Sequence, residues 1–163
     1  MMTSTRVRAP QVQEANALAF VHNEAWRETY ASLFPEGRFG SVALAQRERM
    51  WSQILSSNRP NRVIRVAETE GDIVGFAFAG PAKGSDAPRE LELYMIYLRI
   101  HAQGTGAGQM LIDEVLGDSK AILWVAEKNP RAHAFYRRNN FRPDGSTKTD
   151  PDSPEVVEVR FVR

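Results

Sequence analysis

The sequence predicts an α+β (mixed α/β) fold, in which six or seven strands form a mostly antiparallel central sheet flanked by about four helices. Two observations indicate this class. Helical and extended segments follow one another without regular alternation, and only the helix at 106–117 lies where a parallel crossover between strands is needed. The 163 residues contain no repeat, low-complexity tract or linker, so residues 1–163 are expected to form a single domain.

The first part of the chain predicts one strand and two helices. Residues 4–8 alternate weakly between apolar and polar and form the first expected strand. Over 10–32 the apolar residues recur at helical spacing, and the segment 33–37, with its Pro and Gly, ends that helix. A second helix is expected over about 42–55, and one of its faces carries Leu44, Arg47 and Trp51.

A hairpin and a longer strand come next. Strands are expected at 63–68 and 73–79, and the short connection between them contains Gly71, which can adopt the positive φ that a tight hairpin needs. The segment 80–88 is a loop rich in Gly and Pro. It leads into an extended, aromatic-rich strand at 90–98.

Two helices enclose a strand in the following part. The helix at 106–117 comes directly after a glycine-rich turn. Residues 121–126 are nearly all apolar, which is typical of a strand buried on both faces. Asn129 and Pro130 then open a helix that runs to about Arg138, with Pro in its first turn.

The C-terminal segment predicts a loop followed by a strand. Residues 143–154 hold three of the nine prolines together with Asp, Gly and Ser, so an exposed loop is expected there. Residues 156–162 alternate and form the closing strand, and a short extra strand is expected near Phe141. The predicted order is β-α-α-β-β-β-α-β-α-β, with the extra strand in addition.

Composition excludes several classes of protein and site. An apolar content of 42% and a charged content of 25% are ordinary for a soluble globular protein, and the net charge of +1 speaks against binding to nucleic acid or to a membrane surface. There is no Cys, and the three His have no metal-ligand spacing, so no metal is expected. The N-terminus lacks the apolar core of a signal peptide, and a cytoplasmic protein is therefore expected.

The most informative motif is the glycine-rich turn between the strand at 90–98 and the helix at 106–117. Gly104, Gly106 and Gly108 let the backbone approach a ligand closely, and the N-terminus of the helix adds partial positive charge. The turn is thus a candidate site for phosphate groups, although such a cluster by itself is equally compatible with a tight turn that binds nothing.

Two familiar phosphate-binding motifs do not fit this turn. A dinucleotide-binding Rossmann motif requires a third glycine at the position of Gln109. A Walker A loop requires Gly-Lys-Ser/Thr, and no such triplet follows.

Three segments together resemble the GCN5-related N-acetyltransferase (GNAT) family. The pattern Arg/Gln-x-x-Gly-x-Gly/Ala of its phosphate loop is matched by Gln103, Gly106 and Gly108. The segment 129–141 is similar to the family's Asn-x-x-Ala-x-x-Phe-Tyr block, and 26–35 is similar to its first-helix segment. One departure is Asn140, which stands where Gly is frequent; Asn tolerates the left-handed conformation.

The resemblance implies a GNAT-like fold and an acetyl-CoA-dependent N-acetyltransferase. Such an enzyme moves an acetyl group to a primary amine of a small molecule or peptide by direct attack in a ternary complex. The alternative is a non-catalytic CoA-binding regulatory module, and a nucleotide-binding protein is a third reading. The resemblance also favours a homodimer, and it leaves the acceptor open.

The resemblance further implies two catalytic residues. Tyr136 is expected to be the general acid that protonates the departing thiolate, because a phenol with a pKa of about 10 keeps its proton at neutral pH. Its alternative role is aromatic packing beside Phe135. Glu92 is expected to be the base that takes the proton of the amine, directly or through water. The alternative for Glu92 is a solvated carboxylate or a structural partner of an Arg.

Other residues are expected to bind the two substrates. The resemblance assigns the pantetheine arm to the backbone of Ile96 and Leu98, which are core residues as well. Glu90, on the face of Glu92 by strand alternation, can attract a cationic amine. Trp26 and Tyr30, four apart on one helix face, line the acceptor pocket or pack in the core. The remaining positions expected to contact CoA are Gln103, Gly104, Thr105, Gly106, Ala107, Gly108, Gln109 and Asn129, the last being alternatively an N-cap alone.

Overall fold

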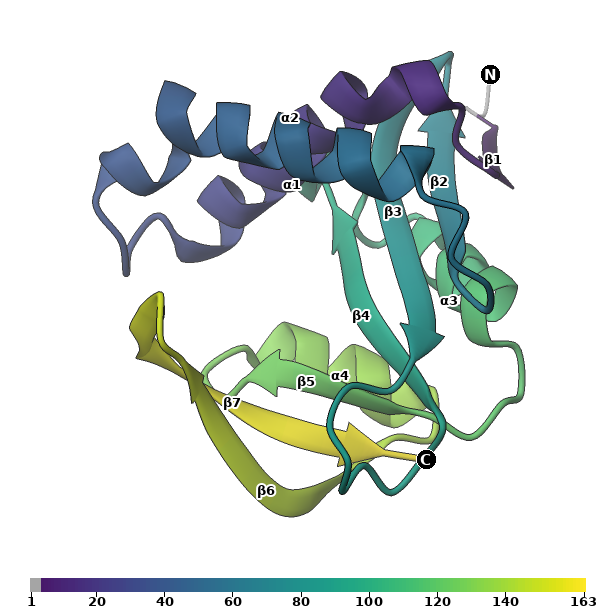
Figure 1. Cartoon of the computed structure of the whole chain (residues 1–163), viewed down its shortest axis with the longest axis vertical. Helices are drawn as coiled ribbons and strands as arrows, with labels where there is room; N and C mark the ends of the chain where they lie inside the picture. The colour runs from purple at the N-terminus through teal and green to yellow at the C-terminus, as the bar shows by residue number, and fades with distance from the viewer. Residues whose placement is uncertain (1–3) are drawn as a thin grey trace. The chain divides into compact units, whose positions relative to one another are not determined.

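The computed structural model describes residues 4–163, which form two compact units. The first unit comprises the chain up to Phe78 together with Met95–Gly117, and the second comprises Ala79–Tyr94 and Asp118–Arg163. Hydrogen bonds order seven strands as β1-β2-β3-β4-β5-β7-β6, and four α-helices accompany them (Figure 1). This confirms the predicted α+β fold, while the single domain stays a prediction.

The strands of the first unit begin with an antiparallel pair. β1 (Thr5–Arg8) pairs with β2 (Val63–Thr69), and β2 is followed by β3 (Asp72–Pro81). The two residues between β2 and β3, Glu70 and Gly71, have φ values of 54° and 88°. Positive φ at both central residues is the geometry of a type I′ hairpin turn, so the predicted hairpin is confirmed.

Three α-helices belong to the first unit. Helices α1 (Ala15–Tyr30) and α2 (Ser41–Ser56) lie side by side (Figure 1), and α3 (Ala107–Leu116) packs against β1 and β2. Short 3-10 turns precede them at η1 (Val12–Glu14), η2 (Glu36–Phe39) and η3 (Ile100–Ala102). The buried faces of these helices carry apolar residues, among them Leu18, Trp51, Leu111 and Ile112.

The second unit is built around the apolar strand β5 (Ile122–Ala126). β5 pairs in parallel with β4 (Leu91–Leu98) and antiparallel with β7 (Ser153–Val162). Four of its five residues are buried, as expected for a strand that is covered on both faces. Helix α4 (Pro130–Arg138) packs on the same unit, where the ring of Tyr136 contacts Phe161 of β7.

The prediction of an exposed loop at 143–154 is wrong. The chain forms strand β6 (Arg142–Asp150), a short turn, and then the start of β7, so the extra strand expected near Phe141 is longer and begins after it. β6 pairs only with β7 at the edge of the sheet, and nearly all of its residues are exposed. Its polar sequence shows no alternation because neither face of β6 is buried.

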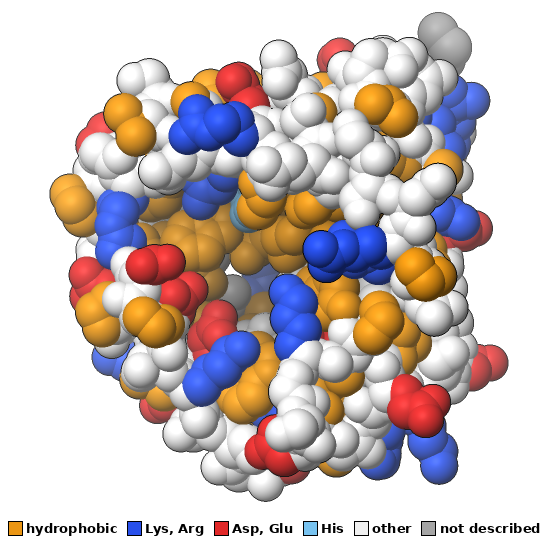
Figure 2. Space-filling view, viewed as in Figure 1, with side chains coloured by type: hydrophobic (Ala, Val, Ile, Leu, Met, Phe, Trp, Pro, Cys, Tyr) orange, Lys and Arg blue, Asp and Glu red, His pale blue; other side chains and the backbone are white. Residues whose placement is uncertain are grey.

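The distribution of charged side chains on the surface agrees with the nearly balanced charge of the chain. Acidic and basic side chains are interspersed on the face seen in Figure 2. Among residues 4–163, no helix is both long enough and apolar enough to cross a bilayer.

Candidate active site

The glycine-rich turn leads from η3 into the N-terminus of α3. Gly104 has a φ of 76° and Gly106, the N-cap of α3, a φ of 91°. A side chain at either position would meet open space, so glycine is needed there for its left-handed backbone and not for lack of room. The hydroxyl of Thr105 donates a hydrogen bond to the carbonyl oxygen of Ala102 at 2.6 Å, and this bond stabilises the turn.

Several main-chain N–H groups of this turn have no partner. Among residues 4–163, the N–H groups of Gly104, Gly106 and Gly108 make no hydrogen bond, while that of Ala107 makes a long one, 3.4 Å, to the Thr105 hydroxyl. Residues 104–106 are also exposed. Unpaired N–H groups at a helix N-terminus form a ready site for an anion, so the turn can hold phosphate groups.

Gln103 and Gln109 flank the turn on either side. Gln103 is half-buried, and its N–H donates to the carbonyl oxygen of Ile100 at 3.2 Å. The Nε2 of Gln109 donates to Asp113 one turn further along α3 at 2.9 Å. The first bond lies at the start of the turn, and the second lies within α3.

The end of β4 carries Ile96 and Leu98, and both side chains are half-buried. β3 approaches this end so closely that a Cβ added at Gly75 would lie 2.4 Å from Cδ2 of Leu98 and 2.7 Å from the carbonyl oxygen of Tyr97. Gly75 therefore allows the close contact of the two strands.

Trp26 and Tyr30 belong to an aromatic cluster of the first unit. Their rings lie 4.7 Å apart, and the Trp26 ring stacks on Phe34 at 6.0 Å. The indole Nε1 of Trp26 donates to the hydroxyl oxygen of Tyr97 on β4 at 2.9 Å. Both expected roles, core packing and an acceptor pocket, are compatible with these half-buried rings.

Glu90 and Glu92 have different surroundings. Glu92 on β4 is only 6% exposed, and its Oε1 accepts a hydrogen bond from the backbone N–H of Lys83 at 3.0 Å. Its other carboxylate oxygen accepts none from residues 4–163. Glu90 is exposed and precedes β4, which begins at Leu91, so the strand expected from residue 90 starts one residue later.

Helix α4 carries Asn129 and Tyr136. The Oδ1 of Asn129 accepts a hydrogen bond from the N–H of Ala132 at 3.2 Å, so the N-cap expected at Asn129 is present. The Tyr136 side chain is 8% exposed, and its ring contacts Phe135, Phe141 and Phe161. After α4, Asn140 has a φ of 69°, the left-handed conformation that Gly would adopt.

The predicted residues divide between the two units. The first unit holds the turn at 103–109 together with Ile96, Leu98, Trp26 and Tyr30. The second holds Glu90, Glu92, Asn129 and Tyr136. Within the first unit, Tyr97 links two of these groups, because it follows Ile96 on β4 and bonds Trp26.

The sequence analysis gave no functional role to three residues around this cluster, which are His22, Arg47 and Trp51. His22 is 7% exposed, stacks on Tyr97 at 5.2 Å, and accepts a hydrogen bond from the Trp51 indole at 3.2 Å. Burial, aided by the nearby Arg47, lowers the pKa of His22 to about 3. The signal in the sequence was the face of α2 that carries both Arg47 and Trp51.

Glu158 on β7 is a further carboxylate that sequence reasoning missed. Burial raises the pKa of Glu158, with Asp150 and Glu92 adding to the effect and Lys148 opposing it. The Nζ of Lys148 lies 3.8 Å from its carboxylate. A strand residue in an alternating segment gives no sequence signal for such a shift.

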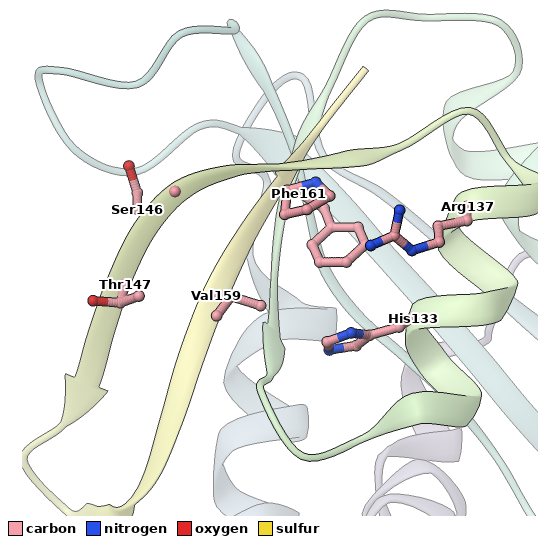
Figure 3. A pocket seen from close by; sticks show the side chains of 8 residues that line it. His133, Arg137, Ser146, Thr147, Val159 and Phe161 are labelled. Atoms are coloured by element: carbon pink, nitrogen blue, oxygen red, sulfur yellow. The ribbon is translucent and has the colours of Figure 1, made fainter.

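A pocket of about 190 Å³ opens in the second unit between α4 and the β6–β7 pair (Figure 3). The register of β6 against β7 shifts between Pro143 and Thr147, where Gly145 has a φ of 90°. His133 and Arg137 form its helical wall, with the guanidinium of Arg137 lying 5.6 Å from the centre of the Phe161 ring. None of the predicted site residues lines this pocket. Elsewhere in the described chain, no group of three or more His, Asp or Glu is arranged to hold a metal ion.

Comparison with known proteins decides the family. The sequence model described as the acetyltransferase (GNAT) family matches residues 19–141. The chain belongs to this family. It is therefore an N-acetyltransferase, and the predicted resemblance is confirmed.

Relatives of this GNAT chain carry the same assignment along most of its length. The uncharacterized N-acetyltransferase YuaI of Bacillus subtilis is 33% identical, over 95% of this chain and 87% of the relative. A probable N-acetyltransferase of Mycobacterium tuberculosis, Rv2775, is 28% identical, over 90% of this chain and 85% of the relative.

Solved structures share the fold of this GNAT chain. The PaiA N-acetyltransferase of Thermoplasma acidophilum, solved in complex with coenzyme A, superposes with a TM-score of 0.72. The alignment is 19% identical and covers 96% of this chain and 98% of that one. At this identity the likeness establishes the fold.

Proposed function

We propose that this GNAT enzyme transfers an acetyl group from acetyl-CoA to a primary amine of a small molecule or peptide by direct attack in a ternary complex. The observation that carries the proposal is the set of unpaired N–H groups at Gly104, Gly106 and Gly108, at the N-terminus of α3. Such donors suit the diphosphate of CoA, and the helix N-terminus adds partial positive charge. A solved structural relative is itself a coenzyme A complex, which agrees with this ligand.

The pantetheine arm is proposed to pair with the backbone of Ile96 and Leu98. The parallel register of β4 with β5 joins Glu92 to Ile122 and Leu93 to Leu123, early in an eight-residue strand. A peptide-like arm can add to the later part of such a strand through main-chain hydrogen bonds.

The proposed reaction has one covalent exchange. The neutral amine nitrogen attacks the thioester carbonyl carbon, a C–N bond forms, the C–S bond breaks, and CoA leaves as a thiolate. The thiolate gains a proton, and the amine nitrogen loses one. General acid and base groups in the right places accelerate both transfers.

Tyr136 is proposed as the acid and Glu92 as the base. The packing of Tyr136 among three phenylalanines restricts the rotation of its ring, which helps to aim the hydroxyl at the leaving sulfur. Glu92 is held by the Lys83 N–H at one oxygen and keeps the other for the proton of the amine or for a bridging water. Asn129 is proposed to contact CoA in addition to capping α4.

The half-buried rings of Trp26 and Tyr30 are proposed to line the acceptor pocket. The exposed carboxylate of Glu90 is proposed to attract the charge of the amine. A cytoplasmic location and a homodimer are part of the same proposal. Light scattering after size-exclusion chromatography measures the dimer directly.

An acceptor panel tests the proposed function. Release of the CoA thiol is followed with amino acids, small polyamines, aminoglycosides and peptides, next to thermal unfolding with acetyl-CoA, ATP or NAD. We expect acetyl-CoA and CoA to raise the unfolding temperature and at least one amine to release thiol. Stabilisation by acetyl-CoA without thiol release from any amine favours the non-catalytic CoA-binding alternative, and stabilisation by ATP or NAD alone contradicts CoA binding.

A further inference from the structure

Helix α2 places a cation on its buried face. Arg47 lies one helical turn before Trp51, which is fully buried, so its side chain points to the same side of the helix. The guanidinium is half-buried, and burial lowers the pKa of Arg47 from its ordinary value. A buried charge of this kind is costly unless an anion compensates it.

The partners of Arg47 within the chain are neutral. Its Nη1 donates to Oδ1 of Asn23, and its guanidinium lies 5.4 Å from the centre of the Trp26 ring. The amide nitrogen of Asn23 donates to the carbonyl oxygen of Phe39 at 2.7 Å, which fixes the amide oxygen toward Arg47. Over residues 4–163, no carboxylate forms an ion pair with Arg47.

Several other partly buried arginines have a carboxylate partner. The ion pairs are Arg8 with Glu14 and Glu68, Arg99 with Glu28, and Arg160 with Asp144. Arg47 differs from these arginines because its hydrogen-bond and ring partners are neutral. Its two neutral partners hold the guanidinium in one orientation without neutralising it.

A chain of contacts links Arg47 to the end of β4. The Trp26 ring beneath the guanidinium donates through Nε1 to the Tyr97 hydroxyl, and Tyr97 lies between Ile96 and Leu98. Those two residues are the proposed contacts of the pantetheine arm. All members of this chain of contacts belong to the first unit.

We propose that Arg47 binds a carboxylate of the amine acceptor, so that the acceptor is an amino acid or another amine that carries a carboxylate. The planar guanidinium matches a carboxylate with two parallel hydrogen bonds, and the aromatic ring beneath it supports the cation from the other side. This inference rests on the proposed acetyl transfer and narrows its acceptor class.

Matched acceptor pairs test the inference. Each pair consists of an L-amino acid and its C-terminal amide, which share the amine and the side chain. We expect wild-type kcat/KM to favour the acid by about 10-fold to 100-fold, as for a charge-assisted pair. Arg47→Gln abolishes that preference by raising KM for the acid and leaves the amide within about twofold. Arg47→Lys, which keeps the charge without the fork, retains part of the preference.

Arg49→Gln on the exposed side of α2 is the control and keeps the wild-type preference. The inference is overturned if wild type uses acids and amides equally, or if Arg47→Gln weakens both alike. It is also overturned if Arg47→Gln lowers acetyl-CoA affinity, since Arg47 then serves a CoA phosphate. In all three results acetyl transfer itself stands. If neither the amino acids nor their amides are acetylated, this result contradicts both the acetyl transfer to these amines and the inference.

Discussion

The ring packing of Tyr136 bears on the acid role that is proposed for it. Its ring packs against Phe135, Phe141 and Phe161, so the packing role is real. The same packing limits the positions that the phenol oxygen can take. A proton donor held in this way needs no reorganisation when the thiolate forms, and the two roles are therefore compatible.

The Tyr136→Phe variant separates chemistry from packing. Phe keeps the ring and its contacts but has no proton to donate, so we expect kcat to fall by about 10²-fold or more while acetyl-CoA affinity stays unchanged. Steady-state thiol release and calorimetric titration measure the two quantities. Wild-type turnover on a good acceptor would remove Tyr136 from the mechanism.

His22 gives stability a pH dependence at the residue scale. Its folded-state pKa of about 3 lies below the unfolded value of about 6.5, so the unfolded chain binds the proton first as pH falls. The stability contributed by the neutral, buried ring is present above pH about 6.5 and is lost as pH falls toward 3. Glu158, with its raised pKa, acts with the opposite sign.

The His22→Gln variant isolates this effect, because Gln can still accept from the Trp51 indole and does not titrate. Between pH 6 and pH 5 we expect wild type to lose about 1 kcal/mol more free energy of unfolding than the variant. Urea unfolding at each pH gives these values. Identical slopes would show that His22 does not titrate between the two states.

At the scale of elements, the turn and helix α3 act together. The two positive-φ glycines turn the chain into α3, and the buried side chains Leu111 and Ile112 fix that helix in the unit. The N–H groups of the turn are thus held in place before any ligand arrives. This arrangement lowers the cost of ordering that binding would otherwise carry.

Two matched glycine variants test the turn. Gly106→Ala and Gly71→Ala each put a side chain into open space at a φ near +90°, so each is expected to cost about 1–2 kcal/mol of stability. Only Gly106 belongs to the proposed diphosphate site. We expect Gly106→Ala to weaken acetyl-CoA binding at least tenfold and Gly71→Ala to leave it unchanged, as measured by calorimetry. Equal affinities in the two variants would contradict the assignment of the turn.

The elements that the sequence predicted are those with a buried face. The helix at 42–55 and the apolar strand at 121–126 correspond to α2 and β5 because their side chains pack on the core. β6 was missed because it is a polar edge strand whose pairing with β7 depends on contacts along the backbone, which leave no pattern in side chains.

The residues of the candidate site also differ in how far the sequence predicts them. A glycine turn before a helix is visible in sequence, since backbone conformation requires particular residues there. Glu158 and the neutral surroundings of Arg47 were not visible, because burial and the absence of a partner arise only when α1, α2 and the strands pack. Contacts between distant segments, such as Trp26 with Tyr97, carry that information.

For the whole molecule, the residues that are proposed for the chemistry are divided between the two units. The first unit supplies the phosphate turn and the aromatic cluster with Arg47, and the second supplies Glu92 and Tyr136. β3 and β4 each continue from one unit into the other, so the strand that carries Glu92 also carries Ile96 and Leu98. The proposed base and the proposed contacts of the pantetheine arm therefore lie on the same strand.

A crystal structure of the protein grown with acetyl-CoA in excess shows whether the glycine-rich turn binds the diphosphate. We expect the diphosphate oxygens to lie about 2.7–3.2 Å from the main-chain nitrogens of Gly104, Gly106 and Gly108. The opposite result is acetyl-CoA bound with its diphosphate elsewhere, or a turn left empty with these N–H groups bonded within the protein.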